Sequence, residues 1–263
     1  MNISHMSSEE KMPVLFVGHG SPMNAIENNE FSRAWIETGK ILPRPKAILS
    51  ISAHWETNGT GVTAMDAPKT IHDFGGFPPA LYEMQYPAPG SLDLADMIRE
   101  VIISADVRLD QKWGLDHGTW SILCKMFPKA DIPVVQLSLD QSKEASFHYL
   151  LGKELKPLRN QGVLIIGSGN IVHNLPMMSW KDEGYDWAIE FDETIKRLIL
   201  AGDHEAIINY ENLGETSLLS IPTNEHYLPL LYILALQDRH EQVRFFTDKV
   251  TLGSISMRSL WVE

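Results

Sequence analysis

Histidines stand at or near the ends of several apolar runs in this 263-residue chain. Imidazole is the commonest protein ligand for Zn²⁺ and a normal ligand for Fe²⁺, and it is also well suited to proton transfer near neutral pH. A cluster of histidines can therefore divide the work of a catalytic centre between metal binding and acid–base chemistry. Five histidines stand in suitable settings: His19, His54, His117, His173 and His226.

Glycines or prolines accompany most of these histidines, in the segments GHGSP, SAHW, GLDHGTW, GSGNIVHN and PTNEHYLPLL. Glycine lets the backbone adopt unusual dihedral angles and lets a ligand approach closely. Taken alone, a histidine after a strand is more often a hydrogen-bonded structural residue. Three of them at strand ends of one sheet favour a shared site instead. The sequence has no HxxxH or HExxH motif, so the fold itself would have to bring the ligands together.

Short apolar runs, typical of strands buried on both faces, must position these histidines. They cover 13–20, 47–54, 61–66, 133–139 and 162–169. Helical spacing of apolar residues is found at 28–41, 91–103, 142–158, 187–201 and 226–237, and two more strands are predicted at 242–247 and 254–261. This alternation predicts an α/β fold with a central, mostly parallel β-sheet flanked by helices. Such sheets bind ligands beyond the carboxyl ends of their strands.

One domain over 12–263 is the simplest organisation, with residues 1–11 as a flexible N-terminal tail. The balance of 22 Lys+Arg against 34 Asp+Glu argues against a nucleic-acid partner, which requires a basic surface. No apolar stretch approaches the roughly 20 residues of a membrane span, and the N-terminus lacks the pattern of a signal peptide. A single cysteine, Cys124, fits a reducing compartment, so a cytoplasmic location is predicted. No feature indicates an oligomeric state.

The remaining segments carry weaker signals. Solvated helix faces are expected for His148, His204 and His240, and an inert, buried thiol for Cys124. A long segment without periodicity, around His72, is typical of a functional loop that covers a site. Its aromatic side chains either line a pocket for a planar substrate or pack the loop onto the sheet: Phe74, Phe77, Tyr82 and Tyr86.

Six motifs, taken in order, resemble those of the class III extradiol ring-cleavage dioxygenase superfamily. They are GHGSP, SAHW, DFGGFP with the YPAPG that follows, GLDHGTW, GSGNIVHNL and PTNEHYLPL. More narrowly, the chain resembles the LigB-like group and its DOPA 4,5-dioxygenase branch, which includes plant betalain-pathway enzymes and bacterial homologues. The resemblance extends from about residue 12 to the C-terminus and implies an α/β catalytic domain with one non-haem metal ion.

The resemblance also implies roles for the histidines. The metal would be Fe(II) in the active enzyme, with Zn(II) as an alternative occupant. The implied ligands are His19, His54 and His226, the last of which stands next to Glu225. His173 corresponds to the catalytic base, and His117 to a second active-site histidine that acts as an acid or orients the substrate and O₂.

The reaction implied is the 4,5-cleavage of a catechol such as 3,4-dihydroxyphenylalanine by O₂. Ser21 and Asn170, close to strand ends, are candidates for hydrogen bonds to a substrate oxygen. The chemistry of the residues leaves two alternatives open on the same site. They are a zinc-dependent hydrolase and a non-catalytic, metal-containing binder of small molecules.

Overall fold

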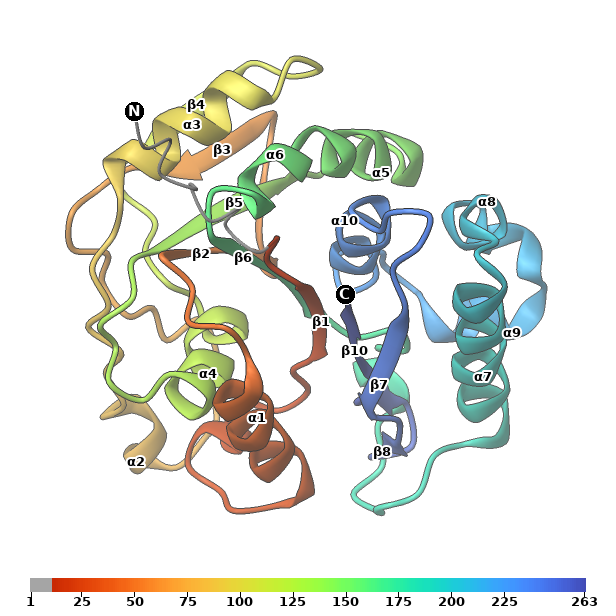
Figure 1. The fold of residues 1–263 in the computed structure, drawn as a ribbon. Coiled ribbons are helices and arrows are strands. Elements are labelled where there is room, and N and C mark those ends of the chain that lie inside the picture. Colours follow the sequence, from red (N-terminus) through yellow and green to blue (C-terminus); the bar gives the residue numbers. More distant parts are fainter. Residues whose placement is uncertain (1–10) are drawn as a thin grey trace, which may run out of the picture.

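The computed structural model describes residues 11–263, so the tail predicted for 1–11 lies outside the described residues except for Lys11. The Lys11 ammonium forms ion pairs with Asp238 and Glu241. The centre of the molecule is an eight-stranded sheet in the order β4-β3-β5-β2-β6-β1-β10-β7 (Figure 1). Its strands are β1 (Val14–Gly18), β2 (Ala47–Thr57), β3 (Thr60–Thr63), β4 (Val107–Asp110), β5 (Val134–Asp140), β6 (Val163–Gly169), β7 (Val243–Thr247) and β10 (Ser259–Val262).

Strands β5, β2, β6 and β1 are parallel neighbours, which brings their carboxyl ends to one edge of the sheet. The edge beyond β1 is antiparallel, because β10 pairs with β1 and β7 pairs with β10. A separate antiparallel pair is formed by β8 (Val250–Thr251) and β9 (Ile255–Ser256). The prediction of a mixed α/β fold around a mostly parallel sheet is confirmed.

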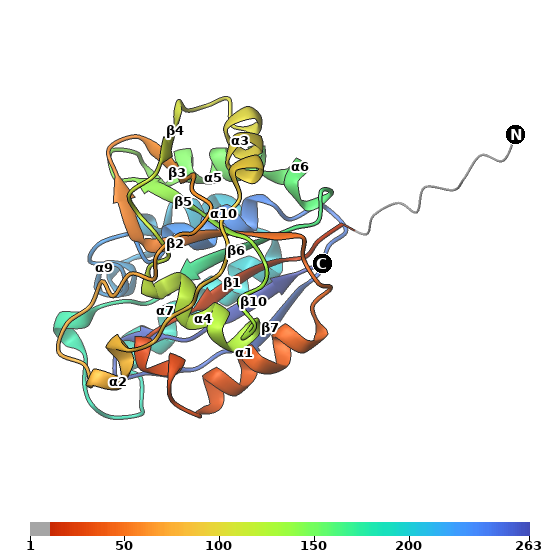
Figure 2. The ribbon, with the colours of Figure 1, turned by 90° about the vertical axis from the view of Figure 1, so that its left-hand side faces the viewer.

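Helices cover both faces of the sheet (Figure 2). In β1, Leu15 and Val17 contact the apolar cluster of α1 (Glu30–Ile41) and α4 (His117–Met126), while Val14 and Phe16 contact the cluster on the other face. That second face is covered by α3 (Leu92–Val101), α5 (Ala145–Glu154), α7 (Asp186–Ala201) and α10 (Leu228–Ala235). Burial on both faces explains why the strands are almost continuously apolar.

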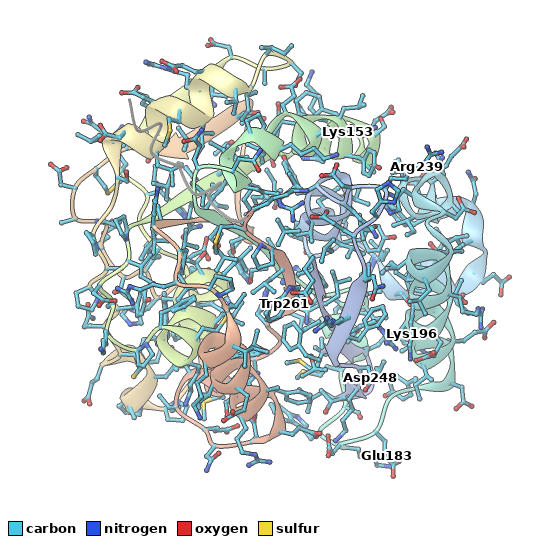
Figure 3. The ribbon with its side chains drawn as sticks, viewed as in Figure 1. Lys153, Glu183, Lys196, Arg239, Asp248 and Trp261 are labelled. Atoms are coloured by element: carbon cyan, nitrogen blue, oxygen red, sulfur yellow. The ribbon has the colours of Figure 1, made fainter. Side chains whose placement is uncertain are left out.

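Shorter elements complete the fold: α2 (Pro79–Tyr82), α6 (Lys156–Arg159), α8 (His204–Ile208), α9 (Glu215–Ser220), η1 (Pro22–Ala25), η2 (Leu175–Met177) and η3 (Tyr210–Leu213). Charged side chains such as Lys196 and Asp248 lie on the outside of the molecule, whereas Trp261 of β10 lies in its middle (Figure 3). Within residues 11–263, no helix has both the length and the apolar character needed to cross a membrane.

Several elements differ from those expected. The helix predicted over 142–158 divides at Leu155 into α5 and α6, where Pro157 lies in the first turn of α6. The strand predicted over 254–261 is two strands, β9 and β10. The short edge strand β4 was not predicted, because its side chains Arg108 and Leu109 are exposed and give no apolar signal.

The prediction of solvated faces is wrong for His148 and His204. His148 on α5 is completely buried against α10, where its Nδ1 lies 2.9 Å from the Tyr232 hydroxyl. His204 is half-buried, with its Nδ1 2.8 Å from the Tyr149 hydroxyl. These errors arose because α5 is itself covered by other helices. His240 is exposed as predicted. Cys124 is half-buried, and burial raises the pKa of its thiol to about 11, so the thiol is inert at neutral pH.

His148 is expected to make the protein sensitive to acid. Burial lowers the pKa of His148 to about 4 from its usual 6.5, so between these values the unfolded chain binds a proton that the folded chain does not. The stability from a neutral His148 is complete above pH 6.5 and is lost as the pH falls towards 4. Urea unfolding across this range should show a flatter pH dependence for His148→Phe. His240→Phe, at an exposed site, should leave the dependence unchanged.

Candidate metal centre

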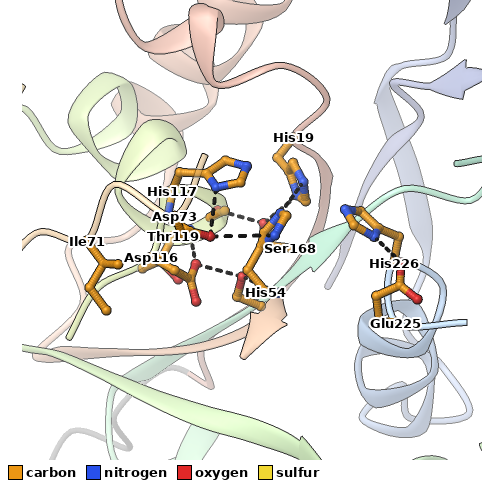
Figure 4. Close-up of polar contacts among 12 residues, drawn as sticks. His19, His54, Ile71, Asp73, Asp116, His117, Thr119, Ser168, Glu225 and His226 are labelled. Atoms are coloured by element: carbon orange, nitrogen blue, oxygen red, sulfur yellow. Dashed lines mark hydrogen bonds and ion pairs between the residues drawn. The ribbon is translucent and has the colours of Figure 1, made fainter. Parts of the chain in front are cut away.

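The structure brings together all five histidines that the sequence singled out. Figure 4 shows four of them, His19, His54, His117 and His226. His19 directly follows β1, His117 is the first residue of α4, and His226 lies just before α10. His173 follows β6 after a short turn. His54 lies inside β2, where pairing with β5 is irregular between Ile51 and Glu56. Such irregularities re-aim side chains.

Three of the rings form a nearly equilateral triangle. The ring centroids of His19 and His54 lie 4.9 Å apart, those of His54 and His226 also 4.9 Å, and those of His19 and His226 5.2 Å. His117 lies beside one corner, with its ring 3.9 Å from that of His54. His173 lies beside another, stacked on His226 at 3.4 Å and nearly parallel to it.

Hydrogen bonds determine which nitrogen is free in two of the corner rings, those of His19 and His226. Ser168 Oγ donates to the Gly118 carbonyl oxygen at 2.6 Å, so the same Oγ accepts the Nδ1–H of His19 at 3.0 Å. At His226, Nδ1 lies 2.9 Å from Glu225 Oε1, whereas Nε2 is buried and has no hydrogen-bond partner. Both rings therefore carry their proton on Nδ1 and present the lone pair of Nε2 to the centre.

The free nitrogens fit a divalent cation. His19 Nε2 and His54 Nε2 lie 3.0 Å apart. Two imidazole nitrogens that share one ion at about 2.0–2.1 Å are separated by about 3 Å when the angle at the ion is near 90°. Burial, followed by the mutual repulsion of the histidines, holds the pKa of His19 and His226 well below its usual value. Neutral imidazole is the form that binds metals.

Two groups of potential ligand atoms each lie within 4.8 Å of one another: His19, His54 and His117 form one, and His173, Glu225 and His226 form the other. An imidazole binds a metal in the plane of its ring. The rings of His173 and His226 are stacked in parallel planes, so they do not direct lone pairs at one ion in this arrangement. The assignment of His19, His54 and His226 as the metal ligands stays a prediction.

Asp73 is a site residue that the sequence analysis missed. Its carboxylate accepts hydrogen bonds from the backbone N–H and from Nδ1 of His117, both at 2.9 Å, and lies 3.6 Å from His54 Nδ1. Burial raises the pKa of Asp73, but the hydrogen bonds and charge of His117 outweigh that effect and lower it. The one available signal was its place at the start of DFGGFP, the motif in the loop that covers the site.

The loop around His72 packs onto the body of the protein, and its role in lining a pocket for a planar substrate stays a prediction. Tyr86 packs the loop down, since it is buried and its hydroxyl donates to the Phe127 carbonyl oxygen at 3.0 Å. Phe74 faces the site, with its ring 5.5 Å from that of His117 and perpendicular to it. Phe77 and Tyr82 surround Phe74.

Ser21 and Asn170 lie at the strand ends as expected, and both are engaged with the backbone. Ser21 Oγ accepts from the Met23 N–H at 3.2 Å and caps η1. Asn170 Nδ2 donates to the Ser256 carbonyl oxygen at 2.7 Å, while Asn170 Oδ1 is buried without a partner. A role for either residue in binding substrate stays a prediction.

Gly169 at the end of β6 is expected to determine how closely His226 approaches the sheet. A Cβ at this position would lie 2.1 Å from the His226 carbonyl oxygen. Gly169→Ala should therefore lower the free energy of unfolding by about 1–3 kcal/mol, as overpacking does, and weaken metal binding. Gly75→Ala is the matched control, because a Cβ there meets nothing within 4 Å. Equal metal affinity in both variants would contradict the expectation.

Comparison with known proteins agrees with this geometry. The family model of the catalytic LigB subunit of aromatic ring-opening dioxygenase matches residues 13–257. A protein of Escherichia coli K12 named 4,5-DOPA dioxygenase extradiol is 49% identical over 261 residues, covering 97% of this chain and 96% of that one. A Beta vulgaris protein of the same name is 41% identical over 235 residues, covering 86% and 87%.

The fold is shared as well. A crystal structure of an uncharacterised Escherichia coli K12 protein superimposes with a TM-score of 0.85 at 43% identity, covering 96% of this chain and all of the other. The family match over 13–257 includes every segment that contributes a histidine to the centre. The chain therefore belongs to the LigB family of extradiol aromatic ring-opening dioxygenases, in the branch of the 4,5-DOPA dioxygenases.

Proposed function

We propose that this enzyme uses O₂ to open the ring of a catechol such as 3,4-dihydroxyphenylalanine by 4,5-cleavage, at one metal ion held by His19, His54 and His226. The observation that carries the proposal is the triangle of the three rings, above all the buried Nε2 of His226, which has no hydrogen-bond partner among residues 11–263. The names of the relatives support the choice of substrate.

A metal held on one side by three histidines keeps positions open, and Fe(II) there would supply coordination for both catechol oxygens and O₂. The protein contributes the proton transfers. Burial lowers the pKa of His173 to about 4, so its imidazole is neutral at pH 7 and able to accept a catechol proton. His117 carries its proton on Nδ1, towards Asp73, which leaves Nε2 to exchange a proton with the substrate.

The aromatic side of the site suits a planar substrate. Phe74 presents its ring beside His117, and Phe77 supports it at 5.3 Å. An aromatic ring that enters beside His117 would contact Phe74 edge-on or in an offset stack. We further propose that the enzyme works in a reducing compartment such as the cytoplasm, which its single cysteine supports.

Asp73→Asn is expected to lower kcat by about 10- to 100-fold, the usual effect of removing a partner of an active-site histidine. Asparagine has one acceptor oxygen in place of two, so its NH₂ group would face either the backbone N–H or the Nδ1–H of His117. The side chain would then no longer fix the ring. Stopped-flow or steady-state O₂ uptake at saturating metal measures the change. Asp131→Asn, which removes a surface partner of Arg44, is the control and should retain full activity. An unchanged kcat in Asp73→Asn would contradict this role.

The proposal is tested by anaerobic reconstitution with Fe(II), followed by L-DOPA and O₂. Stoichiometric O₂ uptake and a yellow ring-opened product are expected, and the Zn(II)-loaded protein should give neither, since Zn²⁺ has no redox chemistry. Failure to consume O₂ with any catechol of a panel would overturn the proposal. The zinc hydrolase alternative predicts turnover without O₂, and membership of a dioxygenase family argues against it.

A further inference from the structure

Asp116 is a completely buried carboxylate directly beneath the histidine cluster (Figure 4). Its Oδ1 accepts from the Ser52 hydroxyl at 2.7 Å and from the backbone N–H of Thr119 at 3.1 Å, so it caps the N-terminus of α4. Its Oδ2 accepts from Gln136 Nε2 at 2.7 Å and from Trp113 Nε1 at 3.4 Å. The backbone N–H of Asp116 in turn donates to Gln136 Oε1 at 3.0 Å. The contacts join the loop before α4 to β2 and β5.

The helix turn that Asp116 caps touches three of the histidines. His117 is its first residue. The carbonyl oxygen of Gly118 accepts from Ser168 Oγ, the group that orients His19. Gly118 also packs directly on β2, since a Cβ there would lie 2.5 Å from Ser52 Oγ and 2.9 Å from His54 Cδ2. A shift of this turn would therefore move three rings at once.

The hydrogen-bonding groups around Asp116 leave little freedom for such a shift. Four donors converge on one carboxylate, and removing it would leave the Gln136 amide buried without its acceptor. A buried polar group without a partner destabilises the fold, and the helix would relieve that cost by moving. Metal and catalytic sites tolerate displacements of only about 0.5 Å before function suffers.

We propose that Asp116 is a positioning residue of this enzyme. By fixing the first turn of α4 it sets the positions of His117, His54 and His19 together. The expected effect of Asp116 on catalysis rests on the proposed function. Its expected effect on metal binding rests only on the geometry of the histidines. Asp116 acts through these histidines and not by contact with the substrate.

Asp116→Asn keeps the size of the side chain but turns one acceptor into a donor that faces the Gln136 amide. Titration with Co(II) should show an affinity reduced by about 10- to 100-fold and an altered visible absorption spectrum, because the ligands move. In the Fe(II) enzyme, kcat should fall over the same range. The matched control is Asp203→Asn. Asp203 caps α8 by accepting a hydrogen bond from the Ala206 N–H at 3.1 Å, far in the sequence from the five histidines of the site. This variant should lower the urea transition midpoint only slightly and leave the Co(II) spectrum unchanged.

Adding Gln136→Glu to Asp116→Asn exchanges the two partners. The carboxylate then lies on β5 and accepts from the amide of the asparagine at position 116, so donors and acceptors match again. The double variant should recover much of the Co(II) affinity, which a loss of general stability would not predict. A wild-type Co(II) spectrum, affinity and kcat in Asp116→Asn would overturn the proposal. If that variant does not fold, Gln136→Leu decides, and an unchanged Co(II) affinity in it overturns the proposal. Absence of O₂ uptake in the wild-type enzyme would overturn the proposed function alone, because Co(II) binding is measured independently.

Discussion

Replacing His226 with alanine is expected to release the metal ion and abolish ring opening. His226 supplies the third corner of the triangle, and its buried Nε2 has no other partner in the structure. Loss of a ligand should cost more than the 10- to 100-fold in metal affinity that is typical of an outer-shell residue. Metal analysis after dialysis should fall from one ion per chain to almost none, and O₂ uptake should become undetectable.

The fold should survive this change, because the contact of His226 with β6 is made by its backbone. The His226 carbonyl oxygen accepts from the Asn170 N–H at 2.8 Å, and alanine retains it. His240→Ala removes an exposed histidine and should change neither metal content nor activity. Retention of a tightly bound ion by a folded His226→Ala protein would show that His226 is not a ligand.

Replacing Arg258 with alanine is expected to cause a large loss of stability. Arg258 is completely buried, and its Nε donates to the equally buried Asp192 carboxylate at 2.8 Å. Ser256 Oγ donates to the other oxygen of that carboxylate. Removing the guanidinium leaves a buried charge without its counter-ion, which costs about 3–5 kcal/mol. Urea denaturation should show this as a lower transition midpoint.

The matched control is Arg244→Ala at the surface. Arg244 pairs with Glu263 at 2.6 Å, but both side chains are well exposed, and such pairs contribute about 0–1 kcal/mol. Asp192→Asn should also destabilise, because it removes the charge of the buried one of the two carboxylates that pair with Arg258. Equal stability of Arg258→Ala and Arg244→Ala would mean that the buried pair contributes no more than a surface one.

The parts of the structure that local sequence determines were predictable. Each strand of the parallel core is a short apolar run, and at β1 the end of the run already places the following histidine at the edge of the sheet where ligands bind. His19 is the clearest case, since it directly follows β1. His54 was expected at the end of its strand, whereas β2 continues through an irregular pairing with β5 that no local pattern encodes.

The supporting residues could not be predicted, because their function depends on partners far away in sequence. Asp73 and Asp116 are ordinary loop carboxylates until the fold brings them to His117 and Gln136. His148 was misjudged for the same reason, since its burial depends on a helix that comes much later in the chain. The division of the histidines into ligands and proton carriers came from family resemblance and not from spacing.

The position of β1 has a consequence for how the chain is made. β1 pairs with β6 on one side and with β10, the last strand, on the other. During synthesis its second edge therefore stays without a partner until the end of the chain emerges, and an unpaired apolar edge is prone to association with other chains. A nascent chain would depend on chaperones for longer than one whose early strands pair with each other. Stopping translation before β10 should yield insoluble product.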